Sequence, residues 1–441
     1  MHSTSRLARW TTVAAATGLL AVLSAGAAVP AGAAVPAGAA VPASAAGAAA
    51  ATTPAAESLP PLSPAALRKA IAGLPNADVT GALLRVSGRA GRWAGTSGTA
   101  DLATGQPVPA DARFRIGSIS KVFTATVVLQ LAAEHRLDLD GTVQQYLPGL
   151  LPADYPPVTV GELLNHTSGL PGGGGAAFWG DGSNQWFVDH RFESWTPRQV
   201  VEGLVEGRPM DFAPGTAQEY NGLNTFIAGL VVERVGGRSF AEEVRDRIIR
   251  PLGLHATSAP AVDDTRLPGP HSHGYLTVIG ADGTTREADV TEQAAWPWAE
   301  GGMISSAADL DRFLTALLGG RLLPPAQQRL LFNVPDVPNH DNKNCEQGPT
   351  AAHACFSMGL MRFTFPDGTE IWGKTGSRPG YTSGMFATRN LARRVVYSLN
   401  PTGLKGAESP YIRGIATAAF APVPGGEQAS AGKPEAVRTS E

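Results

Sequence analysis

The sequence predicts an α/β fold with one sheet that is assembled from both ends of the chain around a mostly helical insertion. Apolar and β-branched residues at 81–87 and 92–99 predict two early strands. Strand-like segments return only near the C-terminus, whereas residues 136–300 are mostly short helical stretches and long loops rich in Gly and Pro. Because strands bury their apolar faces in a common layer, we expect both ends to contribute to one sheet.

Local patterns predict the individual elements. Ser63 followed by Pro64 predicts an N-cap and a first helix over 65–72. The segment Ser118–His135 is apolar nearly all round, which is typical of a central, buried helix. The remaining expected elements are a helix at Ser306–Leu318, strands at 356–365, 369–374, 383–388 and 394–399, and a closing helix at 411–421.

These elements define the expected domains. The α/β sheet domain comprises residues 63–118 and 305–422, and the mostly helical domain comprises residues 119–304. Residues 28–62 contain an imperfect AAVPAG repeat rich in Ala and Pro, and residues 423–441 are polar and rich in Gly and Pro. Neither segment has enough large apolar residues to form a core, so we expect a linker and a disordered tail.

Residues 1–27 predict a signal peptide. Arg6 and Arg9 are the only charged residues in the first 56, and a run of small apolar residues follows them. Small residues suited to cleavage end at Ala27 and again at Ala45. The apolar run is short and lacks a basic flank, which favours a cleaved signal over a membrane anchor. We therefore expect a secreted, extracytoplasmic monomer without stable membrane insertion.

Composition limits the classes of partner. The net charge of −3 and the lack of a basic stripe argue against nucleic acid. Cys345 and Cys355 are the only cysteines, and an exported chain is expected to join them in a disulfide, with two free thiols as the alternative. His271 and His273 have the spacing of two metal ligands but no third ligand pattern follows. We expect neither a metal nor another cofactor.

Lysine supplies only six of the 35 basic residues, yet two lysines lie in patterns that suit acyl transfer. In Ser118-Ile119-Ser120-Lys121 the serine and the lysine share one helix face, and Ser118 gains the free N–H groups of a helix N-terminus. A buried lysine can lose its proton and accept one from a hydroxyl, which arginine cannot do. Ser118 is therefore a candidate nucleophile, with an ordinary helix cap as the alternative.

Three other sequence patterns bear on the chemistry that the chain could perform. Ser430–Lys433 repeats the S-x-x-K spacing, but it lies in the expected disordered tail and is interpreted as accidental. Gly368–Thr375 matches the phosphate-loop pattern G-x-x-x-x-G-K-[ST]. Gly376 and Pro379 then follow where a helix would have to begin, so nucleotide binding is not expected. The sequence contains no G-x-S-x-G, which disfavours an α/β-hydrolase.

Five segments spread along the predicted folded region carry a family resemblance. They are Phe114–Lys121 (FRIGSISK), Leu163–Pro171 (LLNHTSGLP), Pro214–Gly229 (PGTAQEYNGLNTFIAG), Trp298–Phe313 (WAEGGMISSAADLDRF) and Gly373–Gly384 (GKTGSRPGYTSG). Together they resemble the penicillin-recognising serine hydrolases, which include class C β-lactamases, serine D-Ala-D-Ala carboxypeptidases and related esterases. The resemblance implies a β-lactamase/transpeptidase-like fold, in which helices flank an antiparallel sheet and a mostly helical domain is inserted.

The resemblance implies a role for each matching residue of the catalytic group. Ser118 would be the nucleophile, and Lys121 would hold or take its proton. Tyr220 would act as the phenolic base and acid that faces Ser118. Lys374 would lie on an edge strand and supply positive charge for a substrate carboxylate and for the phenolate.

Residues next to this group would bind the reacting carbonyl and the rest of the substrate. The N–H groups of Ser118 and Ser377 would form the oxyanion hole. Thr375 and Gly376 would contact substrate beside it. His166 belongs to a segment that is a structural loop in the family, so we interpret it as structural.

The chain departs from the family at one substrate-binding position. The family element Y-x-N uses its asparagine to grip the substrate amide, but Tyr220-Asn221-Gly222 has glycine there. Asn221 comes one residue early and is expected to point elsewhere. The acyl-transfer groups are intact, whereas the case for an amide substrate is weaker.

The expected function is that of an exported serine hydrolase with an acyl-enzyme at Ser118. Amide hydrolysis of the D-alanyl-D-alanine carboxypeptidase or β-lactamase type is the first expectation, on a small-molecule or peptidoglycan-peptide substrate. An esterase on the same scaffold and a non-catalytic peptidoglycan-binding relative are the alternatives.

Overall fold

The computed structural model describes residues 59–172, 178, 180–280, 282–340 and 352–421. The predicted signal peptide, most of the predicted linker, Cys345 and the predicted tail from 423 lie outside the described residues. Within the described part, no helix is both long and apolar enough to span a membrane.

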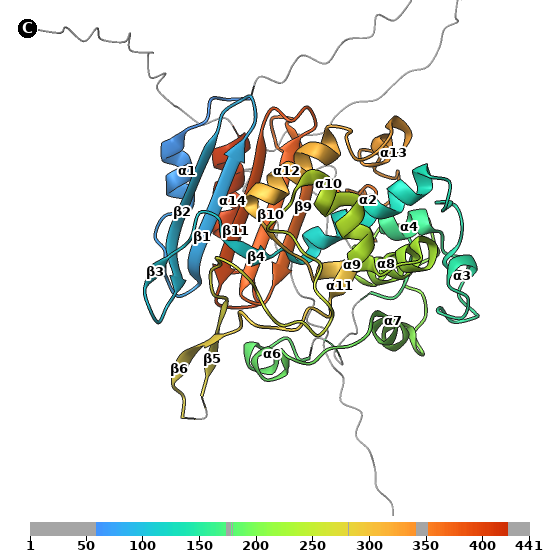
Figure 1. Ribbon diagram of the computed structural model, residues 1–441, viewed down its shortest axis with the longest axis horizontal. Helices are drawn as coiled ribbons and strands as arrows, with labels where there is room; N and C mark the ends of the chain where they lie inside the picture. Colours follow the sequence, from blue (N-terminus) through green and yellow to red (C-terminus); the bar gives the residue numbers. More distant parts are fainter. Residues whose placement is uncertain (1–58, 173–177, 179, 281, 341–351, 422–441) are drawn as a thin grey trace, which may run out of the picture.

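One antiparallel sheet of seven strands forms the centre of the structure, in the order β3-β2-β1-β11-β10-β9-β8. Its strands are β1 (Val79–Ser87), β2 (Trp93–Asp101), β3 (Gln106–Pro107), β8 (Met361–Thr364), β9 (Glu370–Arg378), β10 (Tyr381–Thr388) and β11 (Arg394–Pro401). β1 pairs with β11 from Val79 opposite Pro401 to Ser87 opposite Arg394, so both ends of the chain meet inside the sheet (Figure 1). The predicted α/β fold is confirmed.

Helices cover both faces of the sheet. α1 (Pro64–Ala70) and α14 (Ser409–Phe420) lie on one face, and α12 (Ala307–Leu318) packs against β1, β10 and β11 on the other (Figure 1). Neighbouring residues of β1 serve opposite layers, because side chains alternate along a strand. Leu84 is in the core with Phe420 of α14, whereas Leu83 is in the core with Phe313 of α12.

The rest of the chain packs mainly as helices around α2 (Ser120–Ala133). Eleven of the 14 residues of α2 are buried, as its apolar sequence predicted. It contacts α8 (Leu223–Gly236), α11 (Trp298–Gly301) and α13 (Pro325–Leu330). The other helices are α3 (Val143–Tyr146), α4 (Val160–Leu164), α6 (Asn184–His190), α7 (Pro197–Val205), α9 (Phe240–Val244) and α10 (Arg250–Leu252), with a π-helical turn at Arg245–Ile249.

Two short strand pairs were not predicted. β5 (Tyr275–Ile279) and β6 (Thr285–Asp289) form a hairpin that projects from the body of the molecule (Figure 1). β4 (Arg113–Arg115) pairs with β7 (Ile304–Ser306). Such strands give little sequence signal because they are only three to five residues long.

Candidate active site

Ser118 lies in a 3-10 turn, Gly117–Ile119, that links β4 to α2. The predicted helix therefore begins at Ser120, two residues later than its sequence suggested. Lys121 occupies the first turn of α2 with its side chain 4% exposed, and its Nζ donates a hydrogen bond to Ser118 Oγ at 3.0 Å. The predicted serine and lysine are thus in direct contact.

Two glycines allow this turn to lie directly on β9. A Cβ at Gly117, where φ is +51°, would lie 2.5 Å from the backbone nitrogen of Ser377. A Cβ at Gly376 would lie 1.9 Å from the carbonyl oxygen of Ile116. The close approach brings the backbones of Ser118 and Ser377 together, which is the arrangement that an oxyanion hole between their N–H groups requires.

Tyr220 precedes α8 and faces both predicted catalytic lysines. Lys121 Nζ lies 5.1 Å and Lys374 Nζ 4.5 Å from the centroid of the Tyr220 ring. Its hydroxyl oxygen is buried and has no partner at full hydrogen-bond geometry among the described residues. Burial alone would raise the pKa of Tyr220, but the two ammonium charges outweigh burial and hold this pKa below its usual value.

Lys374 projects from β9 toward the ring of Tyr220. Its Nζ donates to the carbonyl oxygen of Thr375 at 3.1 Å. Burial, together with the charge of Lys121, lowers the pKa of Lys374, while Tyr220 opposes the change. The side chain of Thr375 lines an apolar pocket between the sheet and α14 and lies 3.5 Å from Lys374 Nζ through its hydroxyl.

Glu300, at the third position of α11, is a member of the site that the sequence analysis did not single out. Lys121 Nζ donates to the carbonyl oxygen of Glu300 at 3.0 Å and makes a short ion pair with its carboxylate oxygen Oε1. One signal could have indicated this residue. Glu300 is the only charged residue between Glu292 and Asp309, in an apolar segment of a family motif.

The ion pair with Glu300 determines the charge of Lys121. Burial would lower the pKa of Lys121, but the carboxylate of Glu300 and the nearby Tyr220 outweigh burial and raise it. Lys121 is therefore an ammonium group that donates to Ser118 Oγ. Of the two roles implied by the family, this arrangement favours holding the serine over taking its proton, and it leaves Tyr220 as the candidate base.

Gly222 is adjacent to Glu300. Its backbone has φ −65° and ψ −33°, which any residue can adopt, and an added Cβ would lie 3.1 Å from Glu300 Oε1. The glutamate therefore fills the space next to the position where the family has asparagine. Asn221 points elsewhere, as predicted, because its amide donates to the carbonyl oxygen of Leu170 and accepts from the N–H of Leu223.

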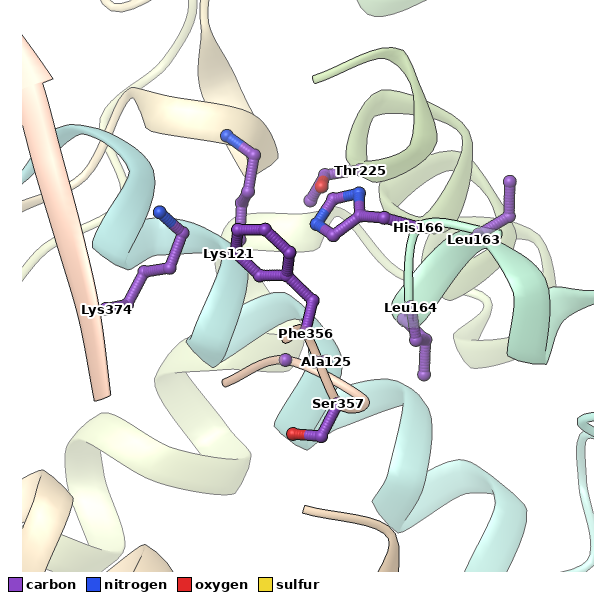
Figure 2. A pocket seen from close by; sticks show the side chains of 10 residues that line it. Lys121, Ala125, Leu163, Leu164, His166, Thr225, Phe356, Ser357 and Lys374 are labelled. Atoms are coloured by element: carbon purple, nitrogen blue, oxygen red, sulfur yellow. The ribbon is translucent and has the colours of Figure 1, made fainter. Parts of the chain in front are cut away.

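His166 borders the site more closely than a purely structural interpretation suggests. Its ring lies 4.7 Å from the Tyr220 ring and 5.2 Å from the Phe356 ring. Its Nδ1 accepts from the side-chain amide of Asn224 at 3.1 Å. Burial, followed by the charges of the two lysines, lowers the pKa of His166 well below its usual value, so the ring is neutral. Figure 2 shows it lining a small pocket with Lys121 and Lys374.

The buried side chain of Gln218 links its own segment, which carries Tyr220, to the segments around Asn165 and Phe356. Its buried amide nitrogen donates to the carbonyl oxygens of Asn165 and Phe356, and its oxygen accepts from the N–H groups of Cys355 and Phe356. Phe356 stacks on Tyr220 with ring centroids 5.1 Å apart. Cys355 is disulfide-bonded. Its predicted pairing with Cys345 stays a prediction, because Cys345 lies outside the described residues.

The two histidines whose spacing resembles that of metal ligands, His271 and His273, make ordinary contacts. His273 Nδ1 lies 2.7 Å from a carboxylate oxygen of Asp289, and His271 lies beside it. In the described ranges of the chain, no three His, Cys, Asp or Glu side chains are grouped so that they could hold a metal ion.

The fold and this serine, lysine and tyrosine arrangement define a penicillin-recognising serine hydrolase. A family model described as Beta-lactamase matches residues 67–418, and the chain belongs to that family.

Individual relatives differ in their named activities. "Penicillin-binding protein 4" of Amycolatopsis lactamdurans is 32% identical over 52% of this chain and 56% of its own length. "Esterase EstB" of Burkholderia gladioli is 30% identical over 50% of this chain and 60% of its own length. The chain thus matches little more than half of either relative.

Solved structures extend the comparison. A D-stereospecific amidohydrolase from Streptomyces sp. is 33% identical, with a TM-score of 0.67 over 79% of this chain and 97% of its own. D-amino acid amidase from Ochrobactrum anthropi SV3 is 24% identical with a TM-score of 0.61, which shows the shared fold alone.

Proposed function

We propose that this protein is an exported serine hydrolase that forms an acyl-enzyme at Ser118 and cleaves amide bonds that follow a D-amino acid residue. D-alanyl-D-alanine peptides, D-amino acid amides and β-lactams are the substrates of this type. The observation that carries the proposal is the contact of Ser118 with a protonated Lys121, beside a tyrosine whose pKa two ammonium groups lower. The named activities of the penicillin-binding protein and the amidohydrolase support this substrate class.

In each half of the proposed reaction Tyr220 acts first as a base and then as an acid. Ser118 Oγ attacks the carbonyl carbon and transfers its proton to the Tyr220 phenolate, while the N–H groups of Ser118 and Ser377 bind the oxyanion. The C–N bond breaks, and Tyr220 returns the proton to the leaving nitrogen. Water then attacks the ester at Ser118 with Tyr220 again as base, which releases the acid and restores the serine.

An esterase is the second candidate, and Gly222 favours it. The glycine offers no side-chain amide to an amide substrate, whereas an ester does not need one. "Esterase EstB" is a named relative with this activity. A panel of a D-alanyl-D-alanine peptide, a cephalosporin and a short-chain ester, compared by kcat/KM, distinguishes the two candidates.

The nucleophile is tested by covalent labelling. Ser118→Ala is expected to abolish labelling by a fluorophosphonate or a fluorescent penicillin, because removal of an acyl-transfer nucleophile costs several orders of magnitude in rate. Ser430→Ala is the matched control, since Ser430 has the same S-x-x-K spacing in the tail. It should label like the parent. Stoichiometric labelling of folded Ser118→Ala would refute the assignment.

Export is tested on the mature protein. Its N-terminus, determined by mass spectrometry of culture medium, should follow Ala27 or Ala45. Retention of residues 1–27 in the exported protein would contradict a cleaved signal.

A further inference from the structure

Helix α11 is held against the catalytic elements by an unusually close contact. A Cβ at Gly229 of α8 would lie 2.5 Å from the Trp298 ring and 2.7 Å from Ala299 Cβ. Only glycine therefore lets α8 and α11 approach to this distance. α11 also contacts α2, β9 and the turn that carries Ser118. Glu300 therefore lies where α2, α8, β9 and the turn that carries Ser118 meet.

The carboxylate of Glu300 has one oxygen in use and one available. Oε1 binds Lys121 Nζ, whereas no described residue makes a hydrogen bond to Oε2. The side chain is 14% exposed, compared with 4% for Lys121, so Glu300 is the more accessible member of the pair. A substrate group that enters the site can reach an unpaired, negatively charged acceptor.

The position of this acceptor relates it to the acyl half of the substrate. Glu300 Oε1 lies 3.1 Å from where a Cβ of Gly222 would be, which is the position whose asparagine grips the substrate amide in related enzymes. An asparagine amide both donates and accepts, but a carboxylate only accepts. The pocket therefore presents an anionic acceptor where the family presents a neutral donor.

We propose that Glu300 is a specificity-determining residue whose carboxylate binds an α-ammonium group on the acyl half of the substrate. The enzyme then acts fastest on D-amino acid residues with a free amino terminus, such as D-amino acid amides, and more slowly on N-acylated substrates, which include penicillins and longer peptides. This inference rests on the proposed function, since it deepens the substrate class of the same site. An ammonium group pairs with the free Oε2, while the carbonyl oxygen of an N-acyl group would face a carboxylate and find no donor.

The charges around the site make the selection feasible. Lys121 and Lys374 would repel a cationic substrate if nothing compensated them. Glu300 offsets the charge of Lys121 through their ion pair, and the Tyr220 phenolate of the proposed mechanism faces Lys374, which projects from β9. A substrate with an ammonium group on the acyl side and a carboxylate on the leaving side would match this distribution.

The test compares two amides that differ only in the amino group. D-alanine p-nitroanilide and N-acetyl-D-alanine p-nitroanilide are assayed with the parent enzyme, Glu300→Gln and Glu300→Asp. The parent should prefer the free amine. Glu300→Gln should lower kcat/KM on both substrates through Lys121, and should lower it roughly tenfold more on the free amine, so that the preference is lost. Glu300→Asp should recover part of the preference.

Glu219→Gln is the matched control. It removes the same charge one residue before Tyr220, but from a carboxylate that lies 3.8 Å from His340 Nε2. Its preference should equal that of the parent. If folded Glu300→Gln lost activity on both substrates by the same factor, Glu300 would act only through Lys121 and the proposal would be wrong. A parent enzyme that prefers the N-acetyl substrate would also overturn it.

Failure of this proposal is distinguishable from failure of the proposed function. Fluorophosphonate labelling at Ser118 does not depend on an ammonium group. Labelling without a preference for the free amine rejects the role of Glu300 alone, whereas absence of labelling in the parent rejects both.

Discussion

Glu300 opposes the two lysines in setting the pKa of Tyr220. The ammonium groups lower this pKa, and the carboxylate raises it. In the proposed mechanism Tyr220 is the base, so kcat/KM for an ester should rise with pH through a pKa below the usual value of 10. The apparent pKa of this rising limb therefore depends on the charges of Lys121, Lys374 and Glu300 around Tyr220.

Removal of the carboxylate charge has a predictable sign. In Glu300→Gln the pKa of Tyr220 should fall further, so the rising limb should move to lower pH. The pKa of Lys121, which Glu300 raises, should fall as well. The pH dependence of kcat/KM on p-nitrophenyl acetate measures the rising limb, which reports Tyr220, and the falling limb, which reports loss of the proton from Lys121. A shift of the rising limb to higher pH would contradict the proposed electrostatics.

Gly222 and Glu300 should behave as a coupled pair. The backbone of Gly222 suits asparagine, but a Cβ 3.1 Å from Glu300 Oε1 would crowd the carboxylate. Gly222→Asn alone should therefore weaken the ion pair with Lys121 and reduce activity on all substrates. In Gly222→Asn/Glu300→Ala the space is free, and the asparagine amide can meet an N-acyl substrate. A rise of about tenfold over Glu300→Ala, which also lacks the ion pair, is expected on N-acetyl-D-alanine p-nitroanilide.

A double-mutant cycle of four proteins measures this coupling. The effects of the two substitutions should be strongly non-additive, because the residues are in contact. Additive effects in folded proteins would show that Glu300 and a side chain at position 222 do not compete for the same space or the same substrate contact.

The contact between the turn Gly117–Ile119 and β9 makes a prediction about the oxyanion hole. Gly117→Ala would place a Cβ 2.5 Å from the nitrogen of Ser377, so the turn must move away from the strand. We expect loss of about a hundredfold or more in kcat, as when one oxyanion donor is removed. The fold should remain, since the sheet itself is untouched.

Gly105→Ala separates this clash from backbone strain. Gly105 has φ +73° and no atom within 4 Å of an added Cβ, so both variants incur a positive-φ cost but only Gly117→Ala clashes. Gly105→Ala should keep parental kcat with a small loss of thermal stability. Equal kcat in the two variants would argue against the role of the contact.

The whole molecule depends on strands from opposite ends of the chain. Four of the seven strands, β8 to β11, follow residue 360, and β1 would be an open edge without β11. A fragment that ends at residue 330 should therefore lack a cooperative thermal transition and should not label with fluorophosphonate. Coexpression with residues 331–441 should restore labelling at Ser118. Cooperative unfolding of the first fragment alone would contradict this dependence.

Local sequence was sufficient for most elements and for part of the site. Apolar and β-branched residues predicted the long strands, and the nearly uniform apolar character of 118–135 predicted the buried helix. Ser118 and Lys121 could be paired because three residues on a helical turn bring side chains together. The β5–β6 hairpin was not predicted because β5 is only five residues long and β6 is polar and exposed at four of its five positions.

The spacing of Ser118 and Lys121 thus predicts residues suited to acyl transfer, because side chains three residues apart lie close together within one helical turn. Contacts between segments that are far apart in the sequence have no comparable local signal. Lys121 and Glu300 are 179 residues apart, and they meet only because Gly229 lets α11 pack closely on α8. The same packing places a carboxylate beside Gly222. The sequence therefore predicts the nucleophile, whereas the charge of Lys121 and the acceptor proposed for the substrate arise from tertiary packing.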